Sequence, residues 1–142
     1  MLRREWLSVA VALAFAGCGA GDSTDVPQAD RRMIGSFRSS IEDRGYVVER
    51  LELNQEEERL ELAYVTKTRD REERASEVWT VGSVFSVHVS RDVSFDRLDA
   101  TALSADGDTV YRYHVETDWA FSFSNNEIDE ETYLDLILDT IE

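Results

Sequence analysis

The chain has 142 residues, of which 30 are acidic and 15 are basic, so its formal net charge is −15 at pH 7. This charge argues against a nucleic-acid partner, because proteins that bind a phosphate backbone present basic surfaces to it. The single cysteine excludes a disulfide within the chain and a metal site built from several cysteines.

The first residues have the composition of an export signal. A charged start that includes Arg3 and Arg4 is followed by an apolar run over residues 8–17. This run is shorter than the roughly 20 apolar residues that a membrane-spanning helix needs. We therefore expect residues 1–17 to be a signal peptide that is removed after Gly17.

Two short motifs refine this expectation. Arg3-Arg4 stands directly before Glu5-Trp6-Leu7, which resembles the twin-arginine export pattern. Phe15-Ala16-Gly17-Cys18 resembles a lipobox. The resemblance implies a lipid on Cys18 that anchors the exported protein in the outer face of the cytoplasmic membrane, with residues 18–26 as a flexible tether. The alternative is an ordinary signal peptide cut nearby, with Cys18 incidental.

The choice between lysine and arginine is as informative as the net charge. Lys67 is the only lysine among the 15 basic residues. An acidic chain that prefers arginine to lysine resembles the proteins of salt-loving archaea. At molar salt the Debye length falls to about 3 Å, which screens the self-repulsion of such a chain. The alternative is an acidic protein from an organism of ordinary salinity.

The first part of the expected domain contains a helix and two strands. Residues 27–44 have an apolar stripe at helical spacing, formed by Met33, Ile34, Phe37 and Ile41. Gly45 suits the left-handed residue that ends a helix. Residues 46–53 and 60–66 alternate apolar and polar positions, which predicts an antiparallel hairpin with Leu53 opposite Leu60 and Leu51 opposite Leu62.

The second half follows a similar order. Residues 70–91 fit both a helical stripe and a strand alternation, and their length favours a helix. Residues 98–103 and 110–115 flank Asp106-Gly107, a strong hairpin turn signal. This turn places Asp99 opposite His114 on the polar face. A final helix begins at Asp129 and has an apolar stripe of Leu134, Ile137, Leu138 and Ile141.

These elements predict one α+β domain over residues 27–142. Two hairpins form an antiparallel sheet, and the helices pack on one face of it in the order α-ββ-α-ββ-α.

The pattern of residues offers little that is typical of catalysis. Asp99 and His114 could orient an imidazole for acid–base chemistry, but cross-strand pairs of this kind are ordinary sheet contacts. No Gly-x-Ser-x-Gly nucleophile motif occurs in the chain. The two histidines and Asp106-Gly107-Asp108 do not match the spacing of zinc or calcium sites. We therefore expect no catalytic residue, no metal and no cofactor.

One group of side chains could bind a ligand. Trp119, Phe121 and Phe123 alternate in a short stretch and could line an apolar groove near His114, although aromatic residues at such a place are more often part of the core. We keep Trp119, Phe121 and His114 as possible binding residues.

The whole pattern resembles a class of small haloarchaeal lipoproteins of uncharacterised function. Besides the leader motifs, the resemblance rests on three segments, which are Phe95-Asp96-Arg97-Leu98-Asp99-Ala100-Thr101, Asp106-Gly107 and Val115-Glu116-Thr117-Asp118-Trp119-Ala120. It implies a cell-surface location and a compact α+β domain, and it implies no activity. Our first hypothesis is a non-enzymatic domain that binds another envelope protein. The alternatives are a small-ligand binding module near Trp119 and Phe121 and, third, a hydrolase.

Overall fold

The computed structural model describes residues 26–68 and 70–142. The expected signal peptide with Arg3, Arg4 and Gly17, the expected lipid site Cys18 and all of the tether except Val26 lie outside these residues. Within the described part of the chain, no helix is long and apolar enough to cross a membrane.

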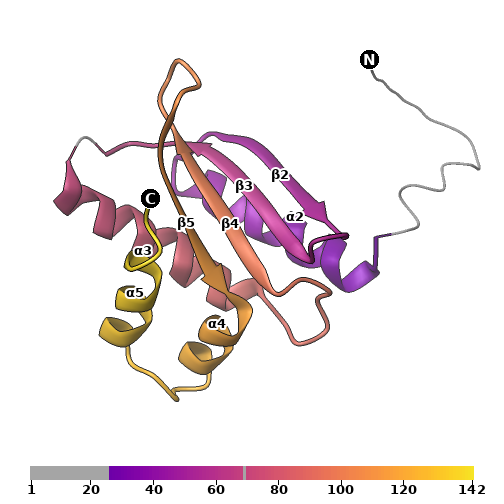
Figure 1. Ribbon diagram of the computed structural model, residues 1–142. Helices are drawn as coiled ribbons and strands as arrows, with labels where there is room; N and C mark the ends of the chain where they lie inside the picture. The colour runs from indigo at the N-terminus through magenta and orange to yellow at the C-terminus, as the bar shows by residue number, and fades with distance from the viewer. Residues whose placement is uncertain (1–25, 69) are drawn as a thin grey trace, which may run out of the picture.

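The domain has two layers, a four-stranded sheet and a layer of helices on one of its faces (Figure 1). The elements in chain order are α2 (Gln28–Asp43), β2 (Val48–Asn54), β3 (Arg59–Val65), α3 (Arg71–His88), β4 (Arg97–Leu103), β5 (Thr109–Glu116), α4 (Thr117–Ser124) and α5 (Glu130–Leu138). The strands lie side by side in the order β2-β3-β4-β5. The predicted α+β class and the placement of the helices on one face are confirmed.

The hairpin registers agree with the sequence analysis. Leu53 pairs with Leu60 and Leu51 with Leu62 between β2 and β3. Asp99 pairs with His114 between β4 and β5. The connection between β4 and β5 is longer than a two-residue turn. The register shifts between Ala102 and Leu103, and the last pair before the connection is Leu103 with Thr109.

The central strand pair differs from the expected antiparallel sheet, since β3 and β4 are parallel and the sheet is mixed. The segment between them forms the helix α3, which settles the helix-or-strand ambiguity of residues 70–91. Two parallel strands begin at the same edge of the sheet, so the chain has to cross back between them. The helix α3 makes this crossover. Arg59 therefore lies beside Arg97, and Glu61 beside Asp99.

The C-terminal part contains one helix more than expected. Trp119, Phe121 and Phe123 belong to α4, a separate short helix before α5. The side chain of Asp129 caps α5 by accepting a hydrogen bond from the amide of Thr132, as the sequence predicts. The chain then passes along the edge of β5, where the backbones of Arg112 and Glu142 bond to each other.

Two acids are buried, Asp30 on α2, which accepts hydrogen bonds from the amide and the hydroxyl of Ser94, and Glu77 in the core. Glu77, on α3, is 2% exposed. One carboxylate oxygen accepts hydrogen bonds from the hydroxyls of Thr66 (2.6 Å), Tyr64 (3.2 Å) and Tyr111, and the other accepts from the backbone amide of Lys67 (2.9 Å). The Glu77 network, formed by these five residues, joins α3 to β3, to β5 and to the segment after β3.

The tyrosines of this network remain hydrogen-bond donors well above neutral pH. Burial raises the pKa of Tyr64, and the neighbouring Tyr113, Tyr111 and Glu77 raise it further. Burial also raises the pKa of Tyr111, and its hydrogen bond to Glu77 adds to the effect. Both hydroxyls are therefore protonated wherever the protein is folded at ordinary pH, and the carboxylate keeps its donors.

We expect Glu77→Ala to lower the free energy of unfolding by about 3 kcal/mol, because two buried tyrosine hydroxyls and the half-buried hydroxyl of Thr66 lose their acceptor. Glu77→Gln keeps the shape of the side chain and should cost less, about 1–2 kcal/mol. Urea unfolding followed by circular dichroism measures both values. Glu72→Ala, at an exposed position of the same helix, is the matched control and should cost about 0.5 kcal/mol. Equal losses for Glu77→Ala and Glu72→Ala would contradict the structural role of the network.

Candidate functional site

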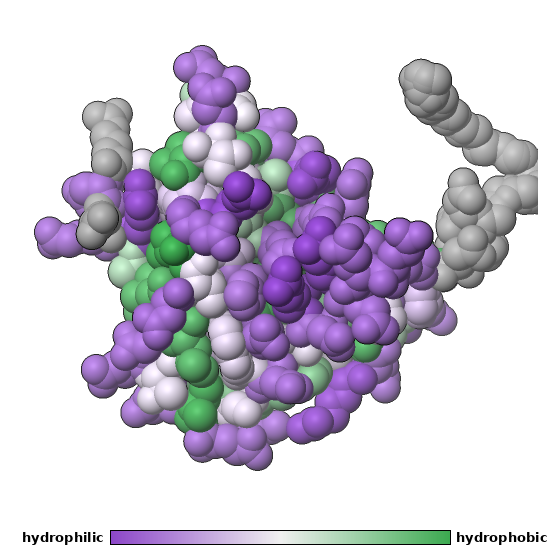
Figure 2. Space-filling model, in the orientation of Figure 1, coloured by the Kyte–Doolittle hydropathy of each residue, from purple (hydrophilic) through white to green (hydrophobic). Residues whose placement is uncertain are grey.

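The face of the sheet that carries no helices is polar. Figure 2 shows hydrophilic side chains gathered over β2, β3 and β4 on this open face. The strand registers arrange its side chains in three rows that cross all four strands. The first row is Asn54, Arg59, Arg97 and Glu116. The second is Glu52, Glu61, Asp99 and His114. The third is Arg50, Ala63, Thr101 and Arg112.

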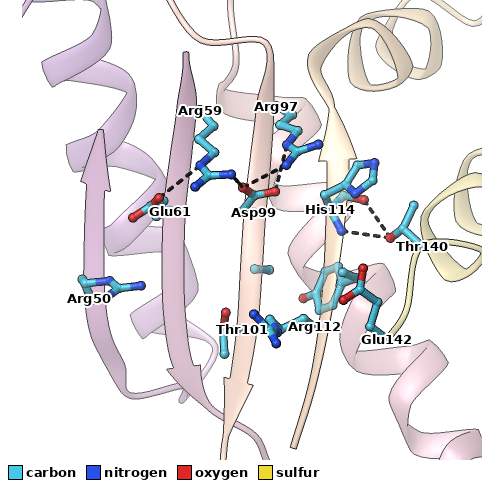
Figure 3. Close-up of a pocket in the computed structure, with 12 residues that line it drawn as sticks. Arg50, Arg59, Glu61, Arg97, Asp99, Thr101, Arg112, His114, Thr140 and Glu142 are labelled. Atoms are coloured by element: carbon cyan, nitrogen blue, oxygen red, sulfur yellow. Dashed lines mark hydrogen bonds and ion pairs between the residues drawn. The ribbon is translucent and has the colours of Figure 1, made fainter. Parts of the chain in front are cut away.

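A hollow of about 280 Å³ lies on the open face. It is lined by residues from all four strands and by Thr140 and Glu142, which border it beyond β5 (Figure 3). Four arginines and three carboxylates take part in the lining, which gives a net charge of +1 with His114 neutral. The arginines are Arg50, Arg59, Arg97 and Arg112, and the carboxylates are Glu61, Asp99 and Glu142. The hollow is thus positive in a chain whose net charge is −15.

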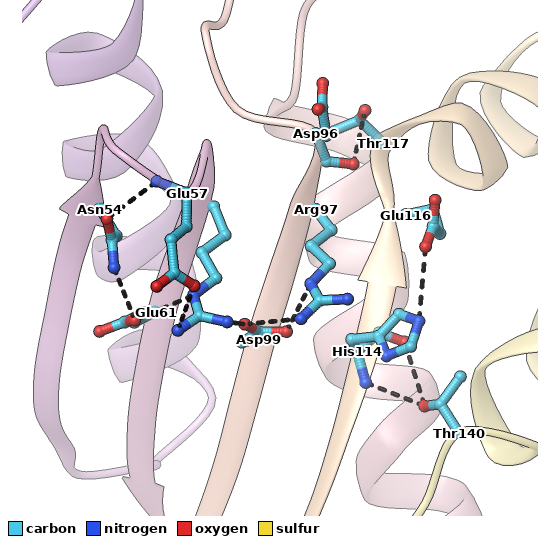
Figure 4. Close-up of polar contacts among 11 residues, drawn as sticks. Asn54, Glu57, Glu61, Asp96, Arg97, Asp99, His114, Glu116, Thr117 and Thr140 are labelled. Carbon is cyan, nitrogen blue, oxygen red and sulfur yellow. Dashed lines mark hydrogen bonds and ion pairs between the residues drawn. The ribbon is translucent and has the colours of Figure 1, made fainter.

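One part of the hollow is filled by ion pairs, which Figure 4 shows. Asp99 receives Arg97 Nε at 2.9 Å on one oxygen and Arg59 Nη1 at 3.2 Å on the other. Arg59 also pairs with Glu61 (3.1 Å) and Glu57 (2.8 Å). The parallel alignment of β3 and β4 brings Arg59, Glu61, Arg97 and Asp99 together, and Glu57 from the turn before β3 adds a third acid to the two arginines.

The other part of the hollow has free positive charge. Among the described residues, no acid pairs with the guanidinium of Arg50 or of Arg112. In Figure 3 both side chains extend from the outer strands, β2 and β5, toward the middle of the sheet, where Thr101 lies on β4. These two guanidinium groups and the Thr101 hydroxyl can donate hydrogen bonds to a bound group.

His114 lies at one side of the hollow but does not pair with Asp99 as an acid–base couple. Its ring nitrogen Nε2 lies 3.5 Å from a carboxylate oxygen of Glu116, and its ring stacks on Trp119 with 5.7 Å between centroids. Both oxygens of Asp99 are engaged by arginines instead.

The three aromatic residues of α4 do not form one groove. Trp119 stacks on His114 beside the hollow. The guanidinium of Arg91 lies 4.9 Å above the ring of Phe121. Phe123 stacks on Tyr133 with 4.6 Å between centroids. The possible binding residues Trp119 and His114 are therefore adjacent, while Phe121 contacts a different part of the surface.

The described residues contain no group of three or more histidine, cysteine, aspartate or glutamate side chains that could hold a metal ion. What the hollow offers chemically is charge and hydrogen-bond donors.

A family model described as "Domain of unknown function (DUF8159)" matches residues 27–142. The chain belongs to this family. The searches of curated proteins and of solved structures return no match. The family description names no activity and no ligand, so a function for this DUF8159 domain has to be argued from its own residues.

The sequence analysis missed the arginines that line the hollow. A signal for them exists in the DUF8159 domain, since Arg50, Arg59, Arg97 and Arg112 all occupy outward positions of strands whose inward positions are apolar. Their convergence depends on the strand order, which alternation within single strands does not reveal.

Asp99→Asn should lower the free energy of unfolding of the DUF8159 domain by about 1 kcal/mol at low salt, because Arg59 and Arg97 lose the carboxylate that they share. The loss should shrink in 1 M NaCl, where the Debye length of about 3 Å weakens the repulsion between the two arginines. Urea unfolding at both salt concentrations measures the effect. Glu42→Gln breaks the exposed Arg38–Glu42 pair and should change stability by less than about 0.5 kcal/mol. A loss that does not depend on salt would argue against the ion-pair explanation.

Proposed function

We propose that this protein is a non-enzymatic binding domain of the cell surface and that the open face of its sheet binds an anionic partner in the envelope. The observation that carries the proposal is the positive lining of the hollow in a strongly acidic chain. Other described arginines without an ion pair, such as Arg74 and Arg91, lie apart from each other, and each covers an aromatic ring. Four arginines in one hollow, two of them without an acidic partner among the described residues, favour a binding role instead.

The envelope partner that we propose is another protein that presents an anionic group, and the alternative is a small anionic ligand. The size of the hollow supports recognition of a single group rather than of a broad surface. Since Phe121 lies apart from the His114–Trp119 stack, an aromatic groove has less support.

The contacts of the polar residues support a non-enzymatic role. A general base needs a free basic atom within reach of a reacting group. Asp99 is bound by two arginines, and His114 lies beside Glu116 and under Trp119. The hydrolase hypothesis would need a nucleophile beside one of these groups, and the lining of the hollow offers only Thr101 and Thr140 as hydroxyls besides Tyr113.

The location at the cell surface rests on the leader motifs. Arg3-Arg4 and the residues before Cys18 support export and lipid attachment, and the acidic, lysine-poor composition supports a halophilic, haloarchaeal source. A lipid on Cys18 would hold the domain at the outer face of the cytoplasmic membrane, in reach of envelope components.

Anion binding can be tested with the full-length chain carrying Cys18→Ser, by ¹H–¹⁵N NMR titration. The probes are a hexaglutamate peptide, citrate and inorganic phosphate, with hexalysine as the control of opposite charge. We expect at least one anion to shift the backbone signals of Thr101 and Arg112, and Arg112→Glu to weaken its binding about tenfold or more. Arg38→Glu on α2 makes the same change of charge away from the hollow and should have little effect. Binding of none of the three anions, or equal losses in both variants, would refute the proposed binding face.

The anchor can be tested by fractionation of cells and by intact mass. We expect the native protein to sediment with membranes and to carry a lipid mass on Cys18, and we expect the Cys18→Ser variant to be released. If native and variant proteins are both free outside the cell with the same cut site, the lipobox interpretation is wrong, and a diffusible ligand becomes the better-supported partner.

A further inference from the structure

The four strand positions of the third row carry positive charge and no acid, whereas each of the other two rows contains an acid. Its side chains are Arg50, Ala63, Thr101 and Arg112, which are cross-strand neighbours from β2 to β5. Glu142, whose backbone bonds to that of Arg112, lies beyond β5 at the end of this row. We propose that this row seats a tetrahedral oxyanion, the phosphate or sulfate ester group of the partner. The inference rests on the proposed function and names the chemistry of the anionic group.

The backbone places the donors on opposite sides of the seat. Three strand spacings separate β2 from β5, so the backbones of Arg50 and Arg112 lie about 14 Å apart. Their long side chains point toward each other and shorten this gap from both sides (Figure 3). Between them, β3 carries only the small side chain of Ala63. Thr101, on β4, lines the hollow and offers a hydroxyl.

The geometry of the donors favours a tetrahedral group over a planar one. One arginine fork bonds both oxygens of a carboxylate and uses two of its roughly four acceptor sites. Two forks from opposite sides and a hydroxyl from below provide more donors, in more directions, than one carboxylate can accept. A phosphate or sulfate ester has three outer oxygens directed to three sides, so that each donor can meet a different oxygen.

The neighbouring row restricts the anion to this place. Glu61 and Asp99 line the hollow next to the third row and would repel an anion that moved toward them. Arg59 and Arg97 lie beyond these acids and are already bound to them. Arg50 and Arg112 therefore remain as the guanidinium groups of the hollow that an anion can reach without displacing an ion pair.

The test measures the dissociation constant of inorganic phosphate and of glycerol 3-phosphate on the full-length Cys18→Ser chain, by NMR at Thr101 and Arg112. We expect saturable binding that weakens about tenfold in Arg50→Gln and in Arg112→Gln and severalfold in Thr101→Val. Arg38→Gln, which removes the same charge from α2, should leave the constant within about twofold. The dispersion of each spectrum reports whether the variant is folded.

Three results would overturn the inference. They are the absence of saturable phosphate binding, an effect of Arg38→Gln as large as that of Arg112→Gln, and binding of acetate as tight as that of phosphate. If hexaglutamate or citrate binds the open face while phosphate does not, the result supports the proposed function and refutes the oxyanion site. If no anion binds, the result refutes both proposals.

A second arm identifies the source of the ester group. Phosphatidylcholine vesicles with and without phosphatidic acid, whose headgroup is a phosphate monoester, are sedimented with the same variants. Binding that requires phosphatidic acid and is lost in Arg112→Gln supports a lipid headgroup in the seat. Binding of glycerol 3-phosphate without binding of these vesicles supports an ester group carried by a protein or a small ligand rather than by a lipid.

Discussion

The structure depends on how the buried carboxylate of Glu77 is satisfied. A charged group in an apolar core is tolerated only when hydrogen bonds replace the water that it loses. Here the donors come from β3, from β5 and from the backbone after β3, so α3 has one position and one rotation in which all of them reach the carboxylate. The apolar residues around Glu77 add burial energy to that arrangement, and the hydrogen bonds make it specific.

The position of α3 decides what the other face of the sheet looks like. Because α3 crosses over the helical face, β4 lies beside β3 and parallel to it, and α4 and α5 pack against α3 on the same side. Most apolar strand positions then face the helices, and the polar positions of four strands meet on the open face. The ion pairs around Asp99 and the third row with its two free arginines are both consequences of this strand order.

Charge acts on two length scales in this domain. Over long distances the net charge of −15 repels an anion. Within the hollow that we propose as its site, hydrogen bonds from guanidinium groups would attract it, and bonds at contact distance are screened by salt far less than interactions across the whole molecule. An environment of high salt would therefore suppress the long-range repulsion more than the local attraction, which is consistent with an anion-binding face on an acidic protein.

The sequence by itself determined the local structure. Apolar spacing located α2 and α5, Gly45 and Asp129 marked a helix end and a helix start, and alternation with turn signals set both hairpin registers, because each of these features depends on neighbours along the chain. Only the tertiary structure decided the parallel alignment of β3 and β4, the burial of Glu77 and the meeting of Arg50 with Arg112 in one hollow. These features depend on the order of strands in the sheet, which is fixed by the packing of α3 across residues far apart in sequence.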